Sequence, residues 1–502
     1  MTSGAGAASA GVRAFRLSDV VARLDAKGLL VAAPGVDVEL TGIVDDSRQV
    51  HAGDLFCAWV GTSADAHHYL PAVEAAGAAA ALVEREIPGV RLPLVVVRDG
   101  RRAAAEAAMV AFRDPAASLL LAGVTGTNGK TTTVWLLRHV LAGSRTSASL
   151  GTLGVIGADG APVPGTESLT TPGPVRLART LRGLVDAGVR AVAMEVSSHA
   201  LDQGRVSGLR FDAAVFTNLS RDHLDYHATV EAYRDAKLSL AGLLREGGVA
   251  VYNADDPAWA ALPARVSRAL SFSVSGTADV HVANLEIGSQ GARFDLVASG
   301  QHVPVVLPLL GAFNVQNALG AAGAALALGI PLEEVAERLG TVPQVPGRLE
   351  RITDTPCPVL RDYAHTPDAL ERVLGALRPL VKGRLIVVFG AGGDRDRGKR
   401  PLMGAAVQRY ADVPIVTSDN PRTEDPEAIM DDVVTGMSPG YVREVDRRRA
   451  IALALSIARV DDLVLLAGKG HETYQIVGTE KRPFDEREIV RELVASGGEV
   501  TA

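Results

Sequence analysis

A glycine-rich segment with one lysine is the strongest chemical signal in this 502-residue chain. It reads Gly126-Thr-Asn-Gly-Lys-Thr-Thr132, after an apolar run (118–125) typical of a buried strand and before helical spacing over 131–141. Glycines in such a turn expose backbone N–H groups to phosphate oxygens, and Lys130 adds a positive charge. The strict P-loop pattern needs glycine where Val124 stands, so only the Gly-Lys-Thr end matches fully. We predict a nucleotide phosphate site at Gly126, Thr127, Asn128, Gly129, Lys130, Thr131 and Thr132.

Two further segments carry groups suited to a magnesium ion where expected strands end. They are Met194-Glu-Val-Ser-Ser-His199 and Thr217-Asn-Leu-Ser-Arg-Asp-His-Leu-Asp-Tyr-His227. The carboxyl ends of parallel strands are where an open α/β sheet presents its ligands. Thr131 and Glu195 offer oxygen ligands for Mg²⁺, and His223 is a candidate second contact. A lone histidine is more often structural, and that interpretation is kept for His199 and His227.

Asn314 and Asn317 lie three residues apart in Gly311-Ala-Phe-Asn-Val-Gln-Asn317, ahead of an alanine-rich segment. If the helix has begun there, this spacing puts both amides on one face. An amide in that place can bind adenine or phosphate. Capping of the helix by asparagine is an equal alternative.

The surrounding pattern predicts an α/β protein of three domains. Apolar runs at 118–125, 191–196, 213–218 and 249–253, with room for crossover helices between them, predict a mostly parallel, doubly wound central sheet. Strands near 358–362, 385–390, 414–418 and 463–467 predict a Rossmann-like C-terminal domain. The N-terminal part is expected to be a separate α/β domain with a helix over 73–81 and a disordered tail at 1–13. The expected domains are 1–114, 115–345 and 346–502.

Composition excludes several classes of protein. The net charge of −7 argues against nucleic acid as a partner, because a phosphate backbone needs an excess of basic residues. Cys57 and Cys357 are too few and too far apart for a disulfide framework or a zinc site, which favours a reducing compartment. Neither a basic, apolar leader nor a run of about 18 apolar residues is present. We expect a cytoplasmic monomer without a membrane partner.

Six segments taken together resemble the Mur ligases, and the resemblance covers nearly the whole chain. These segments are 126–132, 195–199, 217–227, 311–317, 362–367 and 468–472. Asp419-Asn-Pro-Arg422 sharpens the resemblance to members that add meso-2,6-diaminopimelate to UDP-N-acetylmuramoyl-L-alanyl-D-glutamate. It implies ATP and Mg²⁺ as cofactors and three domains, for the UDP end, the ATPase and the incoming amino acid. ATP would phosphorylate a substrate carboxylate, and the amine would attack this acyl phosphate, leaving ADP and phosphate.

The resemblance also assigns substrate contacts in the first half of the chain. Ser47, Thr62, Ser63 and Ala64 are implied near the uridine nucleotide, and Thr170, Thr171, Ser197, Gln203 and Arg205 around the muramoyl dipeptide. Asp45 stands where a leucine is usual and Leu169 where an asparagine is usual, so these two positions depart from the family pattern.

Lys237, in Arg234-Asp-Ala-Lys237, matches a lysine that the family carbamylates with carbon dioxide to N6-carboxylysine and uses to position magnesium. By residue type alone, a solvated helix lysine is the favoured interpretation. Arg348 and Asp362 are implied nucleotide contacts where the central and C-terminal domains meet, with His365 in the same loop.

A pocket for the diamino acid is implied at Arg395, Asp419, Asn420, Pro421, Arg422, Gly468 and Glu472. Carboxylates of a zwitterion suit the planar fork of arginine, and an ammonium suits Glu472 or Asp419. Asn-Pro-Arg after a strand can also be an ordinary turn. Its combination with Gly468-Lys-Gly-His-Glu472 favours the pocket.

Two rival functions remain to be distinguished. A folylpolyglutamate synthase shares the ligase chemistry but would lack the 419–422 pocket and the N-terminal uridine domain. A P-loop switch protein would bind a partner according to its nucleotide and form no amide.

Overall fold

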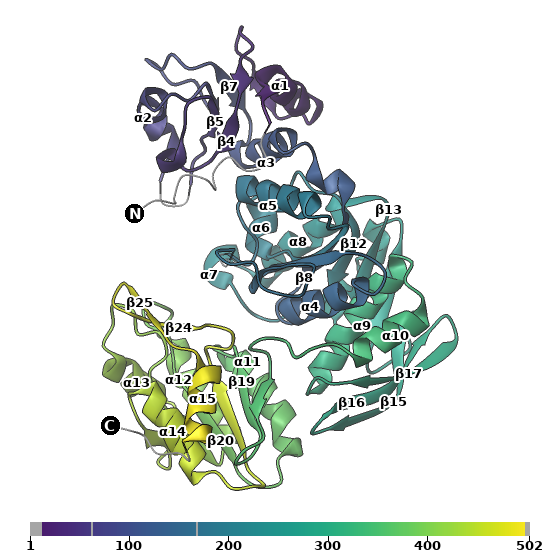
Figure 1. Cartoon of the computed structure of the whole chain (residues 1–502), viewed down its shortest axis with the longest axis vertical. Helices are drawn as coiled ribbons and strands as arrows, with labels where there is room; N and C mark the ends of the chain where they lie inside the picture. The colour runs from purple at the N-terminus through teal and green to yellow at the C-terminus, as the bar shows by residue number, and fades with distance from the viewer. Residues whose placement is uncertain (1–12, 62–63, 167–168, 497–502) are drawn as a thin grey trace. The chain divides into compact units, whose positions relative to one another are not determined.

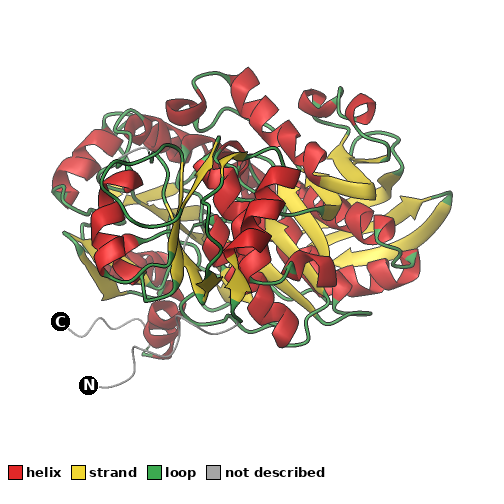
Figure 2. Cartoon of the chain, turned by 90° about the horizontal axis from the view of Figure 1, so that it is seen from above, coloured by secondary structure: helices red, strands yellow, loops and turns green. Residues whose placement is uncertain are grey.

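The structure is a computed structural model that describes residues 13–61, 64–166 and 169–496. The expected tail (1–13) thus lies almost wholly outside the described residues, as do Thr62 and Ser63. Helices and strands make up much of the described chain (Figure 2), which forms two compact units. One contains the described residues up to 282 together with 296–303 and 316–339, and the other contains 283–295, 304–315 and the described residues from 340 onward. Across the described ranges, no helix combines the length and apolar character needed to cross a membrane.

The N-terminal part of the first unit contains a five-stranded sheet of order β2-β7-β6-β5-β4. Its strands β4 to β7 run parallel, and β2 pairs antiparallel with β7. The elements are β1 (Phe15–Arg16), α1 (Leu17–Ala26), β2 (Leu30–Ala32), β3 (Glu39–Leu40), β4 (Gly42–Val44), η1 (Ser47–Gln49), β5 (Asp54–Cys57), η2 (Ala66–Tyr69), α2 (Leu70–Ala75), β6 (Ala80–Val83), β7 (Leu94–Val97), α3 (Gly100–Ala111) and η3 (Pro115–Ser118).

The prediction of a helix over 73–81 is wrong in its second half. The helix α2 ends at Ala75, and Gly77 turns the chain at φ +92°, which a residue with a side chain rarely adopts. The alanines that follow then enter the buried strand β6. Alanine has the highest helix propensity, but burial in the sheet decides its conformation here.

The central sheet has the order β10-β9-β11-β8-β12-β13-β14-β15-β16-β17. Neighbouring strands from β9 to β15 pair in parallel, and β10 is antiparallel to β9, which confirms the mostly parallel sheet. Its elements are β8 (Leu120–Thr125), α4 (Lys130–Leu141), β9 (Ser147–Gly151), β10 (Gly154–Ile156), α5 (Pro174–Asp186), β11 (Ala191–Glu195), α6 (Ser198–Asp202), β12 (Phe211–Phe216), α7 (Leu224–His227), α8 (Val230–Leu238), η4 (Ser239–Leu243), β13 (Leu244–Asn253), η5 (Pro257–Trp259), η6 (Pro263–Arg265), β14 (Ala269–Ser273), β15 (Val280–Gly288), β16 (Gly291–Ala298), β17 (Gln301–Leu307), α9 (Ala312–Ala327) and α10 (Leu332–Gly340).

The strand order brings the three predicted chemical segments together. Strand β8 lies between β11 and β12 and is parallel to both, and Figure 1 shows β8 beside β12. The segments that follow these three strands therefore all leave the sheet at the carboxyl ends of its strands. The chain moves from β8 first toward β9 and later toward β12, which makes the end of β8 a topological switch point. Ligands of open α/β sheets bind at such a point.

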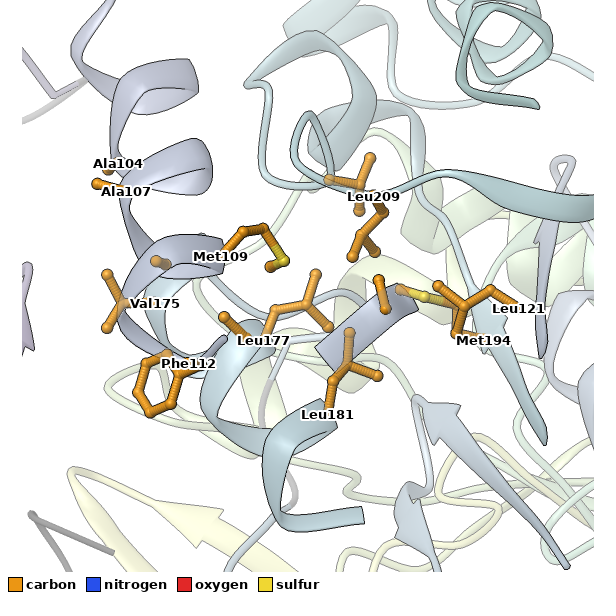
Figure 3. Packing of buried hydrophobic residues seen from close by; sticks show 14 of the residues in the cluster. Ala104, Ala107, Met109, Phe112, Leu121, Val175, Leu177, Leu181, Met194 and Leu209 are labelled. Carbon is orange, nitrogen blue, oxygen red and sulfur yellow. The ribbon is translucent and has the colours of Figure 1, made fainter. Parts of the chain in front are cut away.

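A shared apolar core holds α3 against the central sheet. Met109 of α3 lies beside Leu177 of α5, and Leu181 and Met194 continue the cluster toward β11 (Figure 3). Burying each of these large side chains stabilises the fold by about 1.5–3 kcal/mol. Helix α3 therefore helps to fix the strands that carry the site.

The C-terminal sheet in the second unit has the order β18-β19-β23-β20-β21-β22, parallel except for β18. Alternate residues of β20 point into two different apolar clusters, with Val387 in one and Val388 in the other. A sheet covered on both faces is the Rossmann-like arrangement that was predicted. The elements of this part of the chain are β18 (Glu350–Thr353), β19 (Val359–Asp362), α11 (Pro367–Leu377), η7 (Arg378–Leu380), β20 (Leu385–Phe389), α12 (Lys399–Tyr410), β21 (Val413–Val416), α13 (Pro426–Val434), β22 (Val442–Arg443), α14 (Arg447–Ile457), β23 (Leu463–Ala467), β24 (Tyr474–Val477), β25 (Glu480–Pro483) and α15 (Glu486–Ala495). Strands β24 and β25 pair with each other in a separate two-stranded sheet.

Candidate active site

The glycine-rich loop joins β8 to α4, as predicted, and each terminal glycine is required by its surroundings. Gly126 has φ +147°, and a Cβ there would lie 1.9 Å from Thr217 Oγ1. Gly129 has φ +83°, and its Cβ would lie 2.1 Å from Asn317 Oδ1. The loop therefore brings its backbone close to β12 and α9, and α4 directs its N-terminus at the same place. This is the geometry of a phosphate site.

The lysine of the loop lies against backbone carbonyls. Lys130 Nζ donates to Gly126 O at 2.9 Å and to Thr127 O at 2.8 Å. Thr127 is anchored in turn, because its Oγ1 donates to Ser220 O at 3.2 Å and its N–H to Asn218 O at 2.7 Å. Asn128 N donates to Asn218 Oδ1 at 3.0 Å. The segment after β12 thus fixes the conformation of the loop.

Glu195 is buried at the end of β11 and is oriented by one neighbouring residue. Its Oε1 accepts from Thr152 N at 2.8 Å, and its Oε2 accepts from Thr152 Oγ1 at 3.1 Å. Gly151 makes this possible, because a Cβ there would lie 2.3 Å from Oε1. Thr131 and Glu195 line one small cavity of about 10 Å³. The two predicted oxygen ligands therefore lie together, and Thr132 is buried beside them in α4.

Three histidines and two tyrosines from the segments after β11 and β12 form a ring cluster. The His199 ring centroid lies 4.8 Å from that of His223 and 5.4 Å from that of His227. Burial is the main cause that lowers the pKa of His199 to about 4, so its imidazole is neutral near pH 7. Burial also lowers the pKa of His223, and the charges of Lys130 and Lys237 add to this effect. His223, in the left-handed region at φ +53°, thus faces both lysines.

Lys237 is 1% exposed at the end of α8, so the alternative that residue type alone favours, a solvated helix lysine, is wrong. Its Nζ donates to Gly126 O at 2.8 Å and lies 4.2 Å from the centre of the Tyr233 ring. Burial, with a contribution from Lys130, holds the pKa of Lys237 well below the usual value for lysine. The Nζ of this lysine therefore lies next to the phosphate loop in surroundings that disfavour its charged form.

Five residues that the resemblance implied around a dipeptide are joined by hydrogen bonds. Thr170 Oγ1 lies 3.3 Å from Thr152 Oγ1, which also contacts Glu195. Thr171 Oγ1 donates to Glu195 O at 2.9 Å, and Ser197 N donates to Thr171 Oγ1 at 3.1 Å. Arg205 connects Thr171 to Gln203. It donates from Nη1 to Thr171 O at 2.9 Å and from Nη2 to Gln203 Oε1 at 2.6 Å.

The two positions that depart from the family pattern differ in their surroundings. Asp45 lies near this group, because a Cβ on Gly173 would come within 3.6 Å of Asp45 Oδ2. Burial raises the pKa of Asp45, and the nearby Arg179 partly offsets this rise. Leu169 is 56% exposed. Among the implied uridine contacts, Ser47 begins η1 and Ala64 O accepts from Gly61 N at 2.8 Å.

The two asparagines of α9 have different roles. Asn314 Nδ2 donates to Leu310 O at 2.8 Å, so this amide fixes the entry of its own helix. This hydrogen bond to the backbone at the start of α9 resembles the capping alternative, but the Asn314 side chain donates here, whereas the side chain of an N-cap asparagine accepts. Asn317 is buried and directs its amide at Gly129 of the phosphate loop.

In the second unit, Arg348 and Asp362 lie together. The Arg348 guanidinium lies 4.8 Å from the centre of the Tyr363 ring, and Asp362 accepts from Leu349 N at 2.7 Å and Ala364 N at 2.8 Å. Burial raises the pKa of Asp362, and Arg348 partly offsets it. His365 is exposed, with Nδ1 2.8 Å from Tyr363 O.

The 419–422 segment follows β21 and adjoins both other parts of the implied pocket. Asp419 and Asn420 are buried, and Asn420 Nδ2 donates to Glu472 Oε2 at 2.9 Å. Gly468 has φ +116°, and a Cβ there would lie 2.3 Å from Asp419 Oδ2. Arg422 Nη1 donates to Gly393 O at 2.6 Å.

The loop around Arg395 packs on the same turn. Gly393 N donates to Asn420 O at 2.9 Å, and a Cβ on Gly393 would lie 1.9 Å from Pro421 O. The Arg395 side chain itself is exposed, with Nη1 3.4 Å from Asp394 O. The structure thus brings all the implied pocket residues to one end of the C-terminal sheet.

Two residues in these networks were not predicted. Thr152, which orients Glu195, carries no local signal, because its role arises from a partner 43 residues away. Lys469 is fully buried between Gly468 and Gly470, and its place within a glycine-flanked motif was the available signal.

No group of three or more His, Cys, Asp or Glu side chains in residues 13–61, 64–166 and 169–496 is arranged to hold a metal ion by itself. Thr131 and Glu195 instead provide one hydroxyl and one carboxylate in a shared cavity. Magnesium in nucleotide sites takes one or two carboxylates and completes its shell with phosphate oxygens and water. The oxygen donors present fit that kind of site.

Comparisons with known proteins agree with this arrangement. The family profile "Mur ligase middle domain" matches residues 124–325, and "Mur ligase, glutamate ligase domain" matches residues 347–470. The UDP-N-acetylmuramoyl-L-alanyl-D-glutamate--2,6-diaminopimelate ligase of Gloeobacter violaceus is 45% identical over 96% of this chain and 98% of its own length. The enzyme of the same name from Synechococcus elongatus is 46% identical over 92% of this chain and 95% of its own. A solved structure with that name superposes with a TM-score of 0.66 at 36% identity, covering 92% of this chain and 96% of the other. The chain belongs to the Mur ligase family.

Proposed function

We propose that this protein is an ATP-dependent ligase that joins meso-2,6-diaminopimelate to UDP-N-acetylmuramoyl-L-alanyl-D-glutamate. The observation that carries the proposal is the hydrogen-bonded path from Glu195 to Thr170, Thr171 and Arg205 beside the phosphate loop. It supports a site where a nucleotide phosphate and a substrate carboxylate can meet. The names of relatives that are 45–46% identical over nearly the full length support the same two substrates.

The reaction follows from the chemistry of a carboxylate, which is too poor an electrophile to react with an amine directly. A carboxylate oxygen attacks the γ-phosphorus of ATP, and ADP leaves. The amine of the incoming amino acid then attacks the carbonyl carbon of the acyl phosphate and loses a proton. The tetrahedral oxyanion collapses to an amide and releases phosphate, which retains the oxygen from the carboxylate. Positioning and neutralisation of charge supply most of the acceleration.

The loop residues bind the phosphates in this proposal. The backbone N–H groups in the first turn of α4 face the phosphate oxygens, and Lys130 neutralises the charge that develops on them. The hydroxyls of Thr131 and Thr132 add oxygen donors at the start of α4. Asn317 contacts the nucleotide from α9, and Asn314 orients that helix. Arg348 and Asp362 form the nucleotide contacts of the C-terminal part.

Thr131, Glu195, His223 and a carbamylated Lys237 would hold magnesium with the nucleotide phosphates. When bound, the ion neutralises triphosphate charge and favours transfer of the γ-phosphoryl group. Thr152 keeps the Glu195 carboxylate in one orientation through two hydrogen bonds.

Carbamylation of Lys237 requires a neutral amine, which burial of this side chain favours. The nitrogen lone pair attacks carbon dioxide, the nitrogen loses its proton, and a carbamate with one negative charge forms. This N6-carboxylysine would lie beside Gly126, where a negative group can help position a cation.

The proposed substrate contacts fall in both compact units. In the N-terminal part, Ser47, Thr62, Ser63 and Ala64 bind the uridine nucleotide. Thr170, Thr171, Ser197, Gln203 and Arg205 hold the muramoyl dipeptide. In the C-terminal part, Arg395 and Arg422 receive carboxylates of diaminopimelate, while Asp419 and Glu472 receive an ammonium, with Asn420, Pro421 and Gly468 shaping the pocket.

Three domains with the boundaries 1–114, 115–345 and 346–502 would divide these tasks. We propose a cytoplasmic monomer that acts in peptidoglycan assembly, and through it in cell shape and cell division.

The test is a product analysis. The purified protein is incubated with ATP, Mg²⁺, UDP-N-acetylmuramoyl-L-alanyl-D-glutamate and a mixture of diaminopimelate, lysine and glutamate, and products are weighed by mass spectrometry. The expected result is one diaminopimelate adduct per ADP formed. A folate adduct in a parallel reaction with folate and glutamate would favour the folylpolyglutamate synthase alternative. Slow ATP hydrolysis without any adduct would favour a nucleotide switch.

A further inference from the structure

Lys469 is a fully buried lysine that follows Gly468 at the end of β23. Its Nζ donates to Asn420 Oδ1 at 3.0 Å and to Tyr474 O at 2.8 Å. Lysine is almost never fully buried unless it is paired. The burial of this lysine next to Asn420 of the implied amino-acid pocket therefore has to be explained by its partners.

The cause lies in the charges around Lys469. Its Nζ lies 3.9 Å from Asp419 Oδ1 and 3.7 Å from Glu472 Oε2. Behind them, Arg447 and Glu486 form an ion pair of 2.7 Å with both side chains fully buried. Among these five side chains, three carboxylates lie against two cations, which is a formal charge of −1. One ammonium group of a ligand would neutralise it.

Lys469 also fixes the orientation of the Asn420 amide. Asn420 Oδ1 accepts from Lys469 Nζ and from Ile476 N at 2.9 Å, and its Nδ2 donates to Glu472 Oε2. The amide can satisfy these three bonds in only one of its two flipped orientations. The lysine therefore determines where Asn420 holds the Glu472 carboxylate.

One oxygen of Asp419 is left for a ligand. Asp419 is 6% exposed, and its Oδ2 has no hydrogen-bond partner within the described part of the chain. A buried carboxylate oxygen without a partner destabilises the site unless a ligand donates a hydrogen bond to it. Gly468, which has no Cβ, keeps the space next to this oxygen open. Asp419 thus offers a buried acceptor where the cluster has its excess negative charge.

We propose that Lys469 is a positioning residue for the incoming diamino acid: it orients Asn420 and places a positive charge next to Asp419 and Glu472, the two carboxylates that receive an ammonium group. The inference rests on the proposed function, because it assigns a role within the amino-acid pocket of that ligase. It extends that function by naming the residue that sets the charge of the pocket.

The charge balance predicts a pH dependence. The groups that face Lys469 are Asp419, Glu472, Arg447 and Glu486. Tyr363 lies near both pocket carboxylates and Arg348, and Tyr474 lies near Glu472 and Arg422. Without the lysine cation, one carboxyl group takes up a proton at a higher pH, because the remaining negative charges repel each other. The ammonium then loses a partner as the pH falls. The acidic limb of kcat/KM for diaminopimelate should therefore move to higher pH.

The experiment compares Lys469→Met and Lys469→Gln with wild type. Lys382→Met, at an exposed lysine of the same unit, removes an equal charge outside the pocket and is the control. We expect KM for diaminopimelate to rise on the order of 10- to 100-fold in both Lys469 variants, while KM for ATP and for the UDP-linked substrate stays within about twofold. The acidic limb should move upward by about one pH unit, and the control should match wild type.

Calorimetric titration with diaminopimelate in the presence of ATP analogue and UDP-linked substrate separates this inference from the proposed function. Wild type that binds diaminopimelate without forming product would contradict the function, and weaker binding by the variants would still support the role of Lys469. A folded Lys469→Met protein with wild-type binding and an unchanged pH profile would overturn the inference. An equal rise in KM for all three substrates, or loss of cooperative unfolding in both variants, would also overturn it, since the lysine would then serve the fold as a whole.

Discussion

Replacement of Arg422 by alanine should remove most of the preference for diaminopimelate over lysine. Its guanidinium is held by Gly393 O, and the turn is held separately by backbone bonds from Arg422 N to Ile476 O and from Gly478 N to Arg422 O. Arg422 is in the left-handed region at φ +53°. Alanine also carries a Cβ and has a similar cost there, so the substitution changes the guanidinium and leaves the turn in place.

The size of the effect follows from the loss of one charged pair. Removing one partner of a buried, hydrogen-bonded charge pair costs about 2–5 kcal/mol. At about 1.4 kcal/mol per factor of ten, kcat/KM for diaminopimelate should fall by roughly 30- to 4000-fold. Lysine lacks the distal carboxylate, so its low kcat/KM should change little.

Steady-state kcat/KM for both amino acids, in wild type and Arg422→Ala, measures this ratio. Arg409→Ala, which removes an exposed arginine paired with Glu371, is the matched control and should leave the ratio unchanged. If the ratio in Arg422→Ala equals that of wild type, Arg422 does not read the distal carboxylate and the reasoning is refuted.

Three further substitutions test other parts of the site and the fold. Lys130→Ala should reduce turnover by at least about 10³-fold, because it removes a charge aimed at the transferred phosphoryl group, and should move the unfolding midpoint by no more than about 2–4 °C; near-normal turnover would disprove the phosphate assignment. Lys237→Ala should be inactive and partly restored by formate or acetate, which can supply the missing negative group; full activity without added carboxylate would exclude the metal-positioning role. Glu424→Gln should lower the thermal midpoint at pH 7, because hydrogen bonds from Arg400, followed by one from Asp394 N, lower the pKa of Glu424 to about 2. Since a depressed carboxyl pKa stabilises the fold above the unfolded value near 4.5, the difference from wild type should disappear as the pH falls from about 4.5 through 2, and a constant difference would contradict this.

The elements that sequence pattern predicted well are those with continuous apolar runs. Strands β8, β11, β20 and β23 begin and end within two residues of their predicted positions, because a strand buried on both faces needs apolar residues at every position. The segment 73–81 failed because alanine suits both a helix and a buried strand, and the neighbours in space decide between them. Strands β15 to β17 were not predicted, since their partly exposed faces give a weaker pattern.

The candidate site shows the same division. The phosphate loop was predictable because strand, glycines and lysine are contiguous in sequence. The burial of Lys237 was not predictable from residue type, because it depends on Gly126, 111 residues away. The roles of Thr152 and Lys469 were not predicted for the same reason. Their partners Glu195 and Asn420 lie at or just after the ends of other strands, and a single sequence does not show which strand ends lie together.

The central claim is that the chain makes an amide by first phosphorylating a carboxylate, and oxygen transfer tests it most directly. UDP-N-acetylmuramoyl-L-alanyl-D-glutamate labelled with ¹⁸O in the reacting glutamate carboxylate is incubated with the protein, ATP, Mg²⁺ and diaminopimelate, and the released phosphate is analysed by mass spectrometry. One ¹⁸O atom is expected in each phosphate that accompanies amide formation. Amide formation with unlabelled phosphate would contradict it.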